Sequence, residues 1–458
     1  MPARIKFVAA IVAASLVLSS APAFAQPSAA QRPVSVSELR QRAAQAYSSG
    51  DAATFRSVAT ALHEMRPYND EYMSWVVIGA ALEGDRPAAY EMMLAMQQQG
   101  LSFDFNSTEA TQAIRGTQVY DHVNDLMVRA GQPAGSAEVE FALPEDILLP
   151  TGIAWDSSRE QWLVSDVRKG AVFAVDSNGK ASTLVSADAD NQLQGIYSLL
   201  VDEQANRLWL TSNPTKLREG HDADNARPAE IVELALDTLE IVARHTVPVD
   251  KQPRRLGGMV RTPGGDIYAV DSVLPVIYRL SPGDEELSSF LAAHGMTSLR
   301  GIALSDDGSK LYVADYEMGL LGLDLADKKA FQVQGADNLN LGGIEGLFFR
   351  DGHLVVIQNG ITPQRIMRLQ LTEDGTAIGD IAPLAVALDI FNLPDFGTMK
   401  GAELVFFANS HWVPNAREQG PVQVAKINVD NAPSLISNEV QKIMEEHRKQ
   451  QADAAGDS

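Results

Sequence analysis

The stretch RGIALSDDGSKLYVADYEMGL (residues 300–320) decides the fold, because it holds two short apolar runs joined by a polar turn. A glycine opens the first run, the turn reads DDGS, and the second run ends in an aspartate. Apolar runs of this length on either side of a turn rich in Gly and Asp predict a β-hairpin. Looser copies recur along the chain, and their opening glycines are Gly152, Gly195, Gly258, Gly301, Gly346 and Gly397.

The spacing of these glycines, roughly 40 to 60 residues, is typical of one four-stranded propeller blade. A single sheet of this kind leaves its faces exposed, whereas six sheets stacked around an axis cover one another. We therefore predict a mainly β fold, a six-bladed β-propeller over residues 139–432. The spare strand VEFAL (residues 139–143) is expected to join the sixth blade beside VQVAKINV (residues 422–429), which closes the ring and removes its free edges.

Residues 36–130 have a different period. Apolar residues recur there at spacings of three and four, which predicts amphipathic helices. The tripeptides SGD (residues 49–51) and EGD (residues 83–85) align at an offset of 34 residues, the period of tetratricopeptide repeats (TPR). We predict a small TPR-like helical domain that serves either as a brace packed on the propeller or as a docking surface for a protein partner. Residues 131–138 are expected to form a linker, and residues 433–458 a C-terminal helix with a polar tail.

The first residues have the pattern of a cleavable signal peptide. Arg4 and Lys6 precede an apolar run over residues 7–18, and an Ala-x-Ala site ends at Ala25. Residues 1–25 are therefore expected to be removed, and the mature protein to be periplasmic or secreted from a bacterial cell. No later stretch is apolar enough to predict a membrane span.

The composition excludes several kinds of chemistry. The chain contains no cysteine, so disulfides, zinc–thiolate sites and iron–sulfur clusters cannot form. The formal net charge is −22, which argues against nucleic acid as a partner, because binding to phosphates needs a basic surface.

Four blade sequences carry a family resemblance: residues 152–176 (GIAWDSSREQWLVSDVRKGAVFAVD), 299–316 (LRGIALSDDGSKLYVADY), 344–371 (IEGLFFRDGHLVVIQNGITPQRIMRLQL) and 396–412 (FGTMKGAELVFFANSHW). They resemble the SMP-30/gluconolactonase/LRE-like propellers, in particular exported bacterial members with a helical repeat domain in front. The resemblance implies one divalent cation on the propeller axis. In that family, oxygen ligands come from the residue before the opening glycine of several blades, and the cation polarises the carbonyl of a lactone that is hydrolysed.

The corresponding positions in this chain form a poor ligand set for a cation. They are Thr151, Gln194, Gly257, Arg300, Glu345 and Phe396, the last with Asp395 beside it. Only Glu345 is a strong oxygen ligand in this ring, and Arg300 is a fixed cation. We therefore expect an Arg300–Glu345 pair across the mouth of the propeller and an altered metal site.

Two hypotheses on function follow. In the first, the protein is an exported binding propeller that holds a small polar ligand in its mouth or binds a protein partner. In the alternative, it is a metal-dependent hydrolase of lactones or related esters that uses one divalent cation, calcium or zinc. No nucleophile motif identifies a catalytic residue.

A second ring of polar residues ends the second strand of each blade: Asp166, Asn213, Asp271, Asp315, Asn359 and Asn409. Short Asp and Asn side chains favour a structural role as caps of the following turn. A polar funnel for a ligand is the alternative, and Asp271 and Asp315 are the natural partners of Glu345 if a metal ion binds. The candidate ligand-binding residues are Arg300, Glu345, Gln194, Tyr316, Asn359, Asn409 and His411. Arg254 and Arg255 lie in a solvated loop or add positive charge at the mouth for an anionic ligand.

Overall fold

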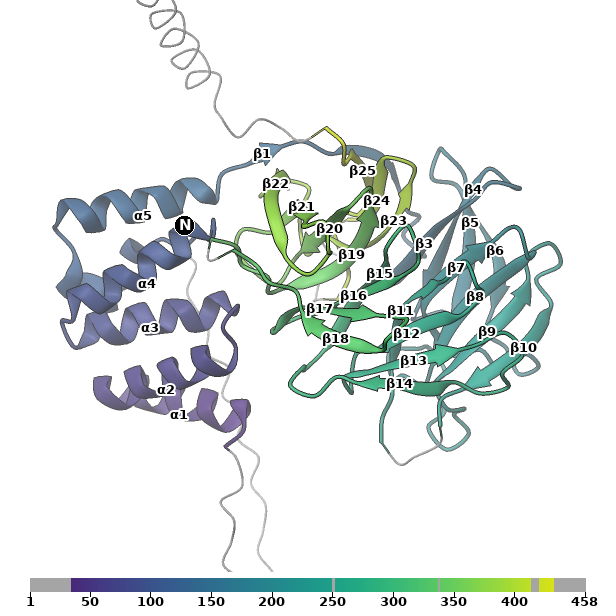
Figure 1. Ribbon diagram of the computed structural model, residues 1–458, viewed down its shortest axis with the longest axis horizontal. Helices are drawn as coiled ribbons and strands as arrows, with labels where there is room; N and C mark the ends of the chain where they lie inside the picture. The colour runs from purple at the N-terminus through teal and green to yellow at the C-terminus, as the bar shows by residue number, and fades with distance from the viewer. Residues whose placement is uncertain (1–33, 249–251, 337, 413–419, 432–458) are drawn as a thin grey trace, which may run out of the picture.

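The computed structural model describes residues 34–248, 252–336, 338–412 and 420–431. Within these residues, a group of N-terminal helices is followed by six β-sheets (Figure 1). The predicted fold class, a six-bladed β-propeller preceded by a helical domain, is confirmed. The expected signal peptide (residues 1–25) and the expected C-terminal helix and tail (residues 433–458) lie outside the described residues.

The helical domain repeats a pair of antiparallel helices. Its elements are α1 (Val36–Ser49), α2 (Ala52–Met65), α3 (Asp70–Leu82), α4 (Arg86–Gln98), the short 3₁₀ helices η1 (Phe105–Ser107) and η2 (Glu109–Ile114), and α5 (Gln118–Ala130). The turns at Gly50 and Gly84 have the same left-handed backbone, with φ of 74° at both glycines. Asp51 and Asp85 then cap α2 and α4 by accepting hydrogen bonds from the backbone three residues on. The predicted 34-residue offset is therefore an offset between helix pairs, while kinship with TPR proteins stays a prediction.

Blades one to three each contain four antiparallel strands. Blade one consists of β3 (Pro150–Asp156), β4 (Gln161–Asp166), β5 (Ala171–Val175) and β6 (Ala181–Ser186). Blade two consists of β7 (Gly195–Asp202), β8 (Arg207–Asn213), β9 (Glu230–Ala235) and β10 (Ile241–Thr246). Blade three consists of β11 (Leu256–Arg261), β12 (Ile267–Asp271), β13 (Val276–Leu280) and β14 (Ser288–Ala292).

Blades four to six complete the ring. Blade four consists of β15 (Leu299–Leu304), β16 (Lys310–Asp315), β17 (Gly319–Asp324) and β18 (Lys329–Gln332). Blade five consists of β19 (Ile344–Arg350), β20 (His353–Gln358), β21 (Arg365–Leu371) and β22 (Ile378–Val386), and blade six contains β23 (Asp395–Lys400), β24 (Glu403–Phe407) and β25 (Gln423–Asn428). The innermost strands β3, β7, β11, β15, β19 and β23 contact one another in a closed circle.

The ring closes as the sequence predicts. Strand β2 (Glu138–Ala142) pairs with β25, with Phe141 opposite Val424, and so supplies the fourth strand of blade six. The expected linker over residues 131–138 is more ordered than predicted, because β1 (Ala134–Gly135) pairs with the edge strand β22 of blade five. The segment that joins the two domains is therefore fixed along the side of the propeller.

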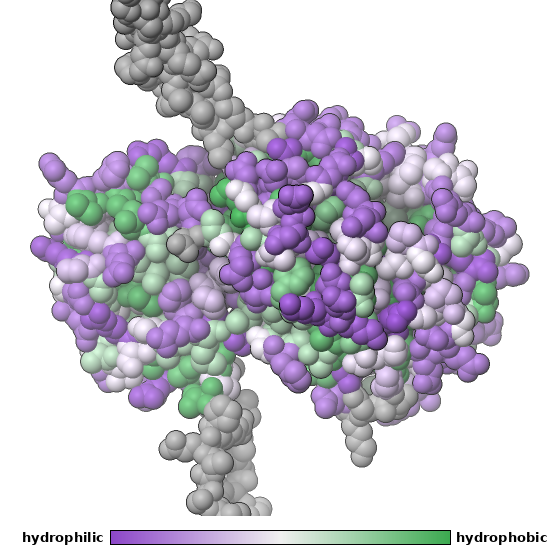
Figure 2. Space-filling view, in the orientation of Figure 1, coloured by the Kyte–Doolittle hydropathy of each residue, from purple (hydrophilic) through white to green (hydrophobic). Residues whose placement is uncertain are grey.

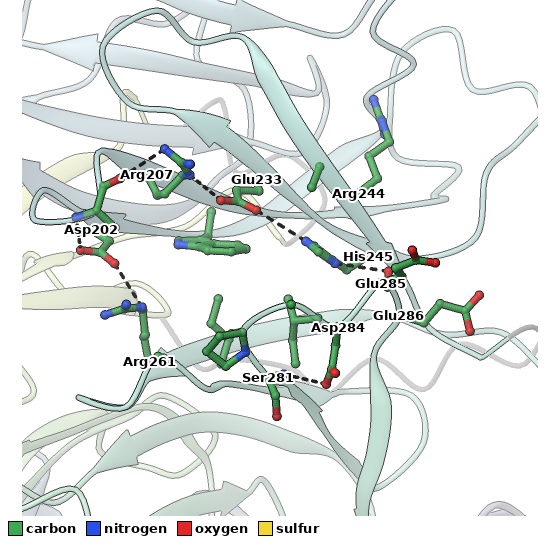
Figure 3. Close-up of a pocket in the computed structure, with 18 of the residues that line it drawn as sticks. Asp202, Arg207, Glu233, Arg244, His245, Arg261, Ser281, Asp284, Glu285 and Glu286 are labelled. Carbon is green, nitrogen blue, oxygen red and sulfur yellow. Dashed lines mark hydrogen bonds and ion pairs between the residues drawn. The ribbon is translucent and has the colours of Figure 1, made fainter.

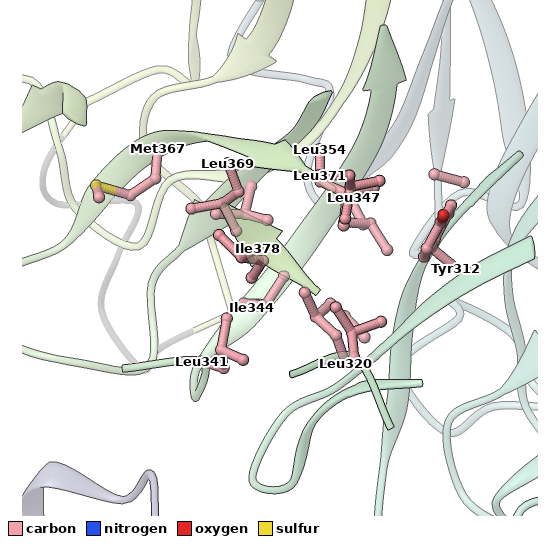
Figure 4. Packing of buried hydrophobic residues seen from close by; sticks show 14 of the residues in the cluster. Tyr312, Leu320, Leu341, Ile344, Leu347, Leu354, Met367, Leu369, Leu371 and Ile378 are labelled. Carbon is pink, nitrogen blue, oxygen red and sulfur yellow. The ribbon is translucent and has the colours of Figure 1, made fainter. Parts of the chain in front are cut away.

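Apolar side chains between neighbouring sheets hold the blades together. Between blades four and five, Tyr312 and Leu320 meet Leu347, Leu354 and Leu369, and all five are buried (Figure 4). Comparable clusters lie between each other pair of neighbouring blades. Burying one such side chain contributes about 1.5–3 kcal/mol, so these clusters are the main source of the propeller's stability.

Each innermost strand contains a shift in pairing register close to its opening glycine. Such a β-bulge places an extra residue in one strand and turns its side chain in a new direction. A glycine next to the bulge allows close approach of the neighbouring blade: a Cβ on Gly301 would lie 2.6 Å from the backbone nitrogen of Leu347. The recurring glycines therefore serve the crowded centre of the ring, and the bulges decide which side chains face the axis.

The helical domain docks on the propeller through the turn between α2 and α3. Arg66 Nε lies 2.6 Å from Glu317 Oε2 in the loop between β16 and β17. Tyr68 packs on Gly342, where a Cβ would lie 2.6 Å from the Tyr68 carbonyl oxygen. The docking site is thus formed by loops at the same end of the propeller as the second-strand ends of blades four and five.

Arg365 of β21 joins the two domains from the propeller side. Its Nη1 donates to the carbonyl oxygen of Gln99 at 2.9 Å, and its Nε donates to Gln358 Oε1 at 2.7 Å. Burial lowers the pKa of Arg365 to about 10, so the guanidinium stays charged at neutral pH. Ile361 of the propeller lies in the apolar core of the helical domain. These contacts make the helices a part of the propeller's structure.

The face of the molecule shown in Figure 2 is largely hydrophilic over the propeller, with small hydrophobic patches that include parts of the helices. None of the helices in the described part of the chain combines the length and the apolar character needed to cross a bilayer.

Candidate functional site

A cavity of about 310 Å³ lies on the propeller axis, where the innermost strands begin. Five blades line it with a residue from the bulge of the innermost strand: Tyr197, Gly257, Arg300, Glu345 and Phe396. The bulges explain why side chains from different blades meet here, because each re-aims one side chain near the start of its strand. We call this space the axial cavity.

An ion pair occupies the inner wall of the axial cavity. Arg300 Nη1 lies 3.5 Å from Glu345 Oε1, and the two side chains are 28% and 10% exposed. Burial raises the pKa of Glu345, and the guanidinium groups of Arg300 and Arg255 oppose that shift. The sequence-based expectation that Arg300 and Glu345 face each other is confirmed.

Asp395 places a second carboxyl group beside this pair. The residue is 1% exposed, and Trp412 Nε1 donates to its Oδ2 at 2.7 Å, while the backbone nitrogen of Phe396 donates to its Oδ1 at 2.8 Å. Burial raises the pKa of Asp395 well above its usual range, and the charge of Glu345 adds to the effect. Two desolvated carboxyl groups therefore share the site, and Asp395 is the one that more readily holds a proton.

Aromatic rings cover both guanidinium groups of the cavity. Arg300 Cζ lies 5.3 Å from the centre of the Tyr316 ring, and Arg255 Cζ lies 5.7 Å from that of Tyr197. Burial raises the pKa of Tyr316, whose hydroxyl donates to Asn359 Oδ1 at 2.9 Å. These rings hold the two arginines in place within the cavity.

Trp412 completes the aromatic wall. Its ring stacks on Tyr197 with the ring centres 6.3 Å apart and the planes at 30°. Its indole nitrogen is the donor to Asp395, so one side chain links the aromatic wall to the buried carboxyl group. The wall therefore places aromatic rings, packed on one another, next to two guanidinium groups.

Four of the predicted ligand-binding residues line the axial cavity: Arg300, Glu345, Tyr316 and Asn359. Three do not, namely Gln194, Asn409 and His411. Asn409 Nδ2 donates to the carbonyl oxygen of Pro421 in its own loop. The His411 ring nitrogens each lie 3.1 Å from a backbone carbonyl oxygen, that of Leu148 before blade one and that of Gly420, so His411 links blade six to the start of blade one.

Gln194 is displaced from the predicted ring by the position of the bulge in blade two. Its Nε2 donates to the carbonyl of Arg227 at 3.0 Å, away from the cavity lining. The register shift in β7 lies between Ile196 and Ser198, so Tyr197 holds the position that Arg300 and Glu345 hold in their blades. The sequence signal, a residue directly before the opening glycine, does not reveal this displacement of three residues from Gln194 to Tyr197.

The aspartates of the second ring cap turns, as the structural interpretation predicts, whereas Asn213 bonds the backbone of Leu256 in blade three and Asn359 lines the axial cavity. Asp315 accepts hydrogen bonds from the backbone nitrogens of Ser298, Glu317 and Met318 at 2.7–2.9 Å. Asp271 likewise accepts from the backbone nitrogen of Val273 at 2.9 Å, and neither carboxylate lines the axial cavity. Asp166 likewise accepts hydrogen bonds from the backbone nitrogens of Leu149, before β3, and Lys169, after β4.

The residues around the axis do not fit the cation that the family resemblance implies. Thr151 is buried and its hydroxyl donates to the Ile196 carbonyl oxygen, Gly257 and Phe396 offer no side-chain oxygen, and Arg300 carries a positive charge beside Glu345. Among the described residues, no three His, Asp or Glu side chains are grouped as a metal site. The suggested set Glu345, Asp271 and Asp315 is therefore not assembled here.

A second chamber, of about 590 Å³, lies further along the axis. It shares Gly258, Arg300, Glu345 and Phe396 with the axial cavity. These four residues therefore separate the two chambers, and the ion pair stands at the boundary.

A larger cleft, of about 780 Å³, lies between blades two and three (Figure 3). Its ionic groups pair with one another: Arg261 Nε lies 3.1 Å from Asp202 Oδ2, Arg207 donates to Glu233, and His245 Nε2 lies 3.7 Å from Glu233 Oε2. The arginines of the cleft are engaged in ion pairs, Arg244 with Glu230, and the remaining charged groups, Asp284, Glu285 and Glu286, are acidic, so the cleft offers fewer free hydrogen-bond donors than the axial cavity does. We therefore take the axial cavity as the candidate site.

Comparisons with known proteins give matches among solved structures. No family model and no curated protein matches the sequence. The chain is similar to a luciferin-regenerating enzyme, with 14% identity over 64% of this chain and 95% of that one and a TM-score of 0.45. It is similar to a gluconolactonase from Xanthomonas campestris, with 14% identity over 63% of this chain and 88% of that one and a TM-score of 0.41. It is also similar to a PQQ-bound aldose sugar dehydrogenase from Streptomyces coelicolor, with 16% identity over 65% of this chain and 99% of that one and a TM-score of 0.46. At these identities the likeness concerns the fold, and the chain is a six-bladed β-propeller with an N-terminal helical domain.

Proposed function

We propose that this protein is an exported binding propeller that holds a small polar organic ligand in its axial cavity. The observation that carries the proposal is the Arg300–Glu345 pair, whose atoms lie 3.5 Å apart at the position where the family resemblance places a metal ligand. A guanidinium group at this distance competes with a cation for Glu345 and repels it.

The composition of the cavity supports an organic ligand. Small-molecule sites combine apolar and aromatic walls with a few placed polar groups, and they begin at volumes of about 300 Å³. The axial cavity matches this description, with about 310 Å³, aromatic walls and two arginines. Calcium, in contrast, takes 6–8 oxygen ligands, which the bulge residues do not supply.

The alternative, a metal-dependent hydrolase of lactones or related esters, has one observation in its favour. Glu345 and Asp395 bring two carboxyl groups to the same cavity, and carboxylate oxygens are the ligands that hard cations prefer. A cation would have to displace Arg300 from Glu345, and both oxygens of Asp395 already accept hydrogen bonds from the protein.

Calorimetric titration separates the two functions. The mature protein, stripped of metal, is titrated with calcium, zinc and manganese, and Glu345→Ala is measured in parallel. The proposal predicts no binding at micromolar concentrations on the axis. A single site of micromolar affinity or better that is lost in Glu345→Ala would instead establish the hydrolase and justify a screen of lactones.

The helical domain supports the propeller in this proposal. Its contacts through Arg66, Tyr68 and Arg365 leave it fixed beside the second-strand loops, as expected of a brace. Docking of a protein partner on the free side of the helices is the second role we propose, since Tyr47 and Leu82 expose 40% of their surface there.

Export to the periplasm or the medium rests on the signal pattern of residues 1–25 alone.

A further inference from the structure

We infer that the ligand of the axial cavity is a small organic acid with one carboxylate and one ring. Its carboxylate binds between Arg255 and Arg300, and its ring lies against Tyr197 and Trp412. This inference rests on the proposed function, because it names the class of ligand for the same cavity.

Arg255 is held so that the end of its side chain stays available. Its Nε donates to Ser272 Oγ at 2.7 Å, and its guanidinium lies over Tyr197. Within the described residues, its two terminal nitrogens form no further hydrogen bond, although the side chain lines the cavity. A guanidinium fixed at Nε presents its other donors as a fork, the geometry that binds a carboxylate through two oxygens.

The hydrogen-bond donors of the Arg300 guanidinium group are also only partly used. Its approach to Glu345, at 3.5 Å, is an ion pair longer than an ordinary hydrogen bond. Its Nε is buried and has no hydrogen-bond partner among the described residues. Ser410 is 4% exposed and lines the same cavity, and its hydroxyl oxygen is likewise buried without a partner in this part of the chain. Buried polar atoms rarely stay unpaired, so these atoms indicate where ligand atoms bind.

The acceptors of the cavity are, by contrast, largely used. Both oxygens of Asp395 accept hydrogen bonds from the protein, and Asn359 Oδ1 accepts one from the Tyr316 hydroxyl. Asn359 Nδ2 in turn donates to the Pro394 carbonyl oxygen. The cavity therefore has spare donors on Arg255, Arg300 and Ser410, while its spare acceptor is Glu345, which Arg300 holds through the longer ion pair. This balance favours a ligand that accepts hydrogen bonds.

The charge balance favours an anion with a single charge. Both oxygens of Asp395 already accept hydrogen bonds from Trp412 and the Phe396 backbone, so Glu345 is the remaining carboxyl group that lines the cavity with Arg255 and Arg300. A carboxylate from a ligand would therefore balance the positive charge of the second guanidinium group. A ligand with an ammonium or amidinium group would meet the same positive charge and bind poorly.

The walls of the axial cavity determine which group the ligand carries beside its carboxylate. The Tyr197 ring stacks on Trp412 and also lies under the Arg255 guanidinium, so these two aromatic side chains offer a ligand mainly their ring edges. Ring edges pack against the face of a second ring in a T-shaped arrangement. A volume of about 310 Å³ limits the ligand to the lower end of the usual range for small molecules.

The test compares isosteric probes of different charge by calorimetry and by tryptophan fluorescence at pH 7. The probes are benzoate, benzamide and benzamidine, with cyclohexanecarboxylate and cyclohexanecarboxamide as the saturated pair. We expect each carboxylate to bind at least about tenfold more tightly than its amide, and benzamidine to show no binding up to about 10 mM. The protein used is the mature full chain.

Three variants locate the binding. Arg300→Gln and Arg255→Gln are each expected to weaken benzoate about ten- to hundredfold, since each removes charged hydrogen bonds. Glu345→Gln removes the competing carboxylate and is expected to strengthen benzoate binding. Arg261→Gln, in the cleft between blades two and three, is the matched control and should leave the affinity unchanged. The opposite signs for Glu345→Gln and Arg300→Gln cannot come from a general loss of folding.

The outcomes separate the inference from the proposed function. Amides that bind as tightly as the acids in the axial cavity would overturn the choice of a carboxylate while leaving an organic ligand in place. Binding of benzamidine alone would reverse the predicted sign of charge. Absence of binding by all five probes would contradict the inference, and a metal bound through Glu345 would overturn the proposed function as well.

Discussion

Arg300 Nη1 and Glu345 Oε1 lie 3.5 Å apart on the propeller axis, at the boundary between two chambers. Both residues come from β-bulges at the start of innermost strands in neighbouring blades. Both side chains are partly buried, so each charge is stabilised by the opposite charge of its partner. The pair therefore places a positive and a negative group side by side at the centre of the ring.

Removing the cation of this pair is expected to destabilise the propeller. Arg300→Met leaves Glu345, 10% exposed, without its partner, and we expect the free energy of unfolding at pH 7 to fall by about 1–3 kcal/mol. Urea denaturation followed by tryptophan fluorescence measures the change. Arg42→Met, at an exposed position on α1, is the control and should change stability by less than about 0.5 kcal/mol. A fully stable Arg300→Met protein would show that Glu345 needs no partner.

The raised pKa of Asp395 predicts how stability depends on pH. The folded protein holds this proton above the unfolded pKa of about 3.9, so ionisation of Asp395 costs stability as pH rises through its folded pKa. Asp395→Asn removes that cost. The melting temperature of the variant minus that of the wild type should therefore increase from pH 4 towards pH 8. A constant difference would mean that folding does not shift the pKa of Asp395, and a difference that falls with rising pH would mean that the folded protein stabilises the carboxylate; either result contradicts the prediction.

The buried Arg365 predicts a local effect on the helical domain. Arg365→Gln leaves the Gln99 carbonyl oxygen and the Gln358 side chain without their donor, and we expect a loss of about 2–4 kcal/mol from the docked state. Hydrogen–deuterium exchange should increase in α3 and α4 and stay unchanged in β7 to β9. Arg350→Gln, which breaks an exposed ion pair with Asp430, is the control. Exchange that rises equally throughout the propeller would argue against a specific role in docking.

Gly342 predicts a second effect on docking. A Cβ at this position would lie 2.6 Å from the Tyr68 carbonyl oxygen, so Gly342→Ala should force the α2–α3 turn away from the propeller at a cost of about 1–3 kcal/mol. Gly379→Ala is the matched control, because the nearest atom to its Cβ is 3.8 Å away. Protease cleavage between the domains should accelerate in the first variant only. Equal resistance of both variants would show that the turn adapts without cost.

Much of the architecture could be predicted from the sequence, because a β-hairpin with a polar turn is formed by residues that are close together in the chain. The copies of the 300–320 stretch predicted the six blades, and the apolar strand near residue 140 predicted the closure of the ring by pairing with β25. The pairing of β1 with β22 was missed, since two residues in a segment rich in Gly and Ala carry no pattern of their own.

The candidate site was predicted in part, and the limit has a physical cause. Arg300 and Glu345 were placed together because their bulges lie next to the opening glycine. In blade two the bulge lies further along, so Tyr197 faces the axis where Gln194 was expected. The burial of Asp395 and its bond to Trp412 arise from packing between loops that no single stretch of sequence describes.

Whether the axis binds an organic anion or a metal ion is tested most directly by diffraction from crystals soaked with manganese and benzoate together. We expect benzoate between Arg255 and Arg300 and no anomalous manganese peak on the axis. A manganese peak bound by Glu345, with Arg300 displaced, would contradict this expectation and assign the cavity to metal-dependent chemistry.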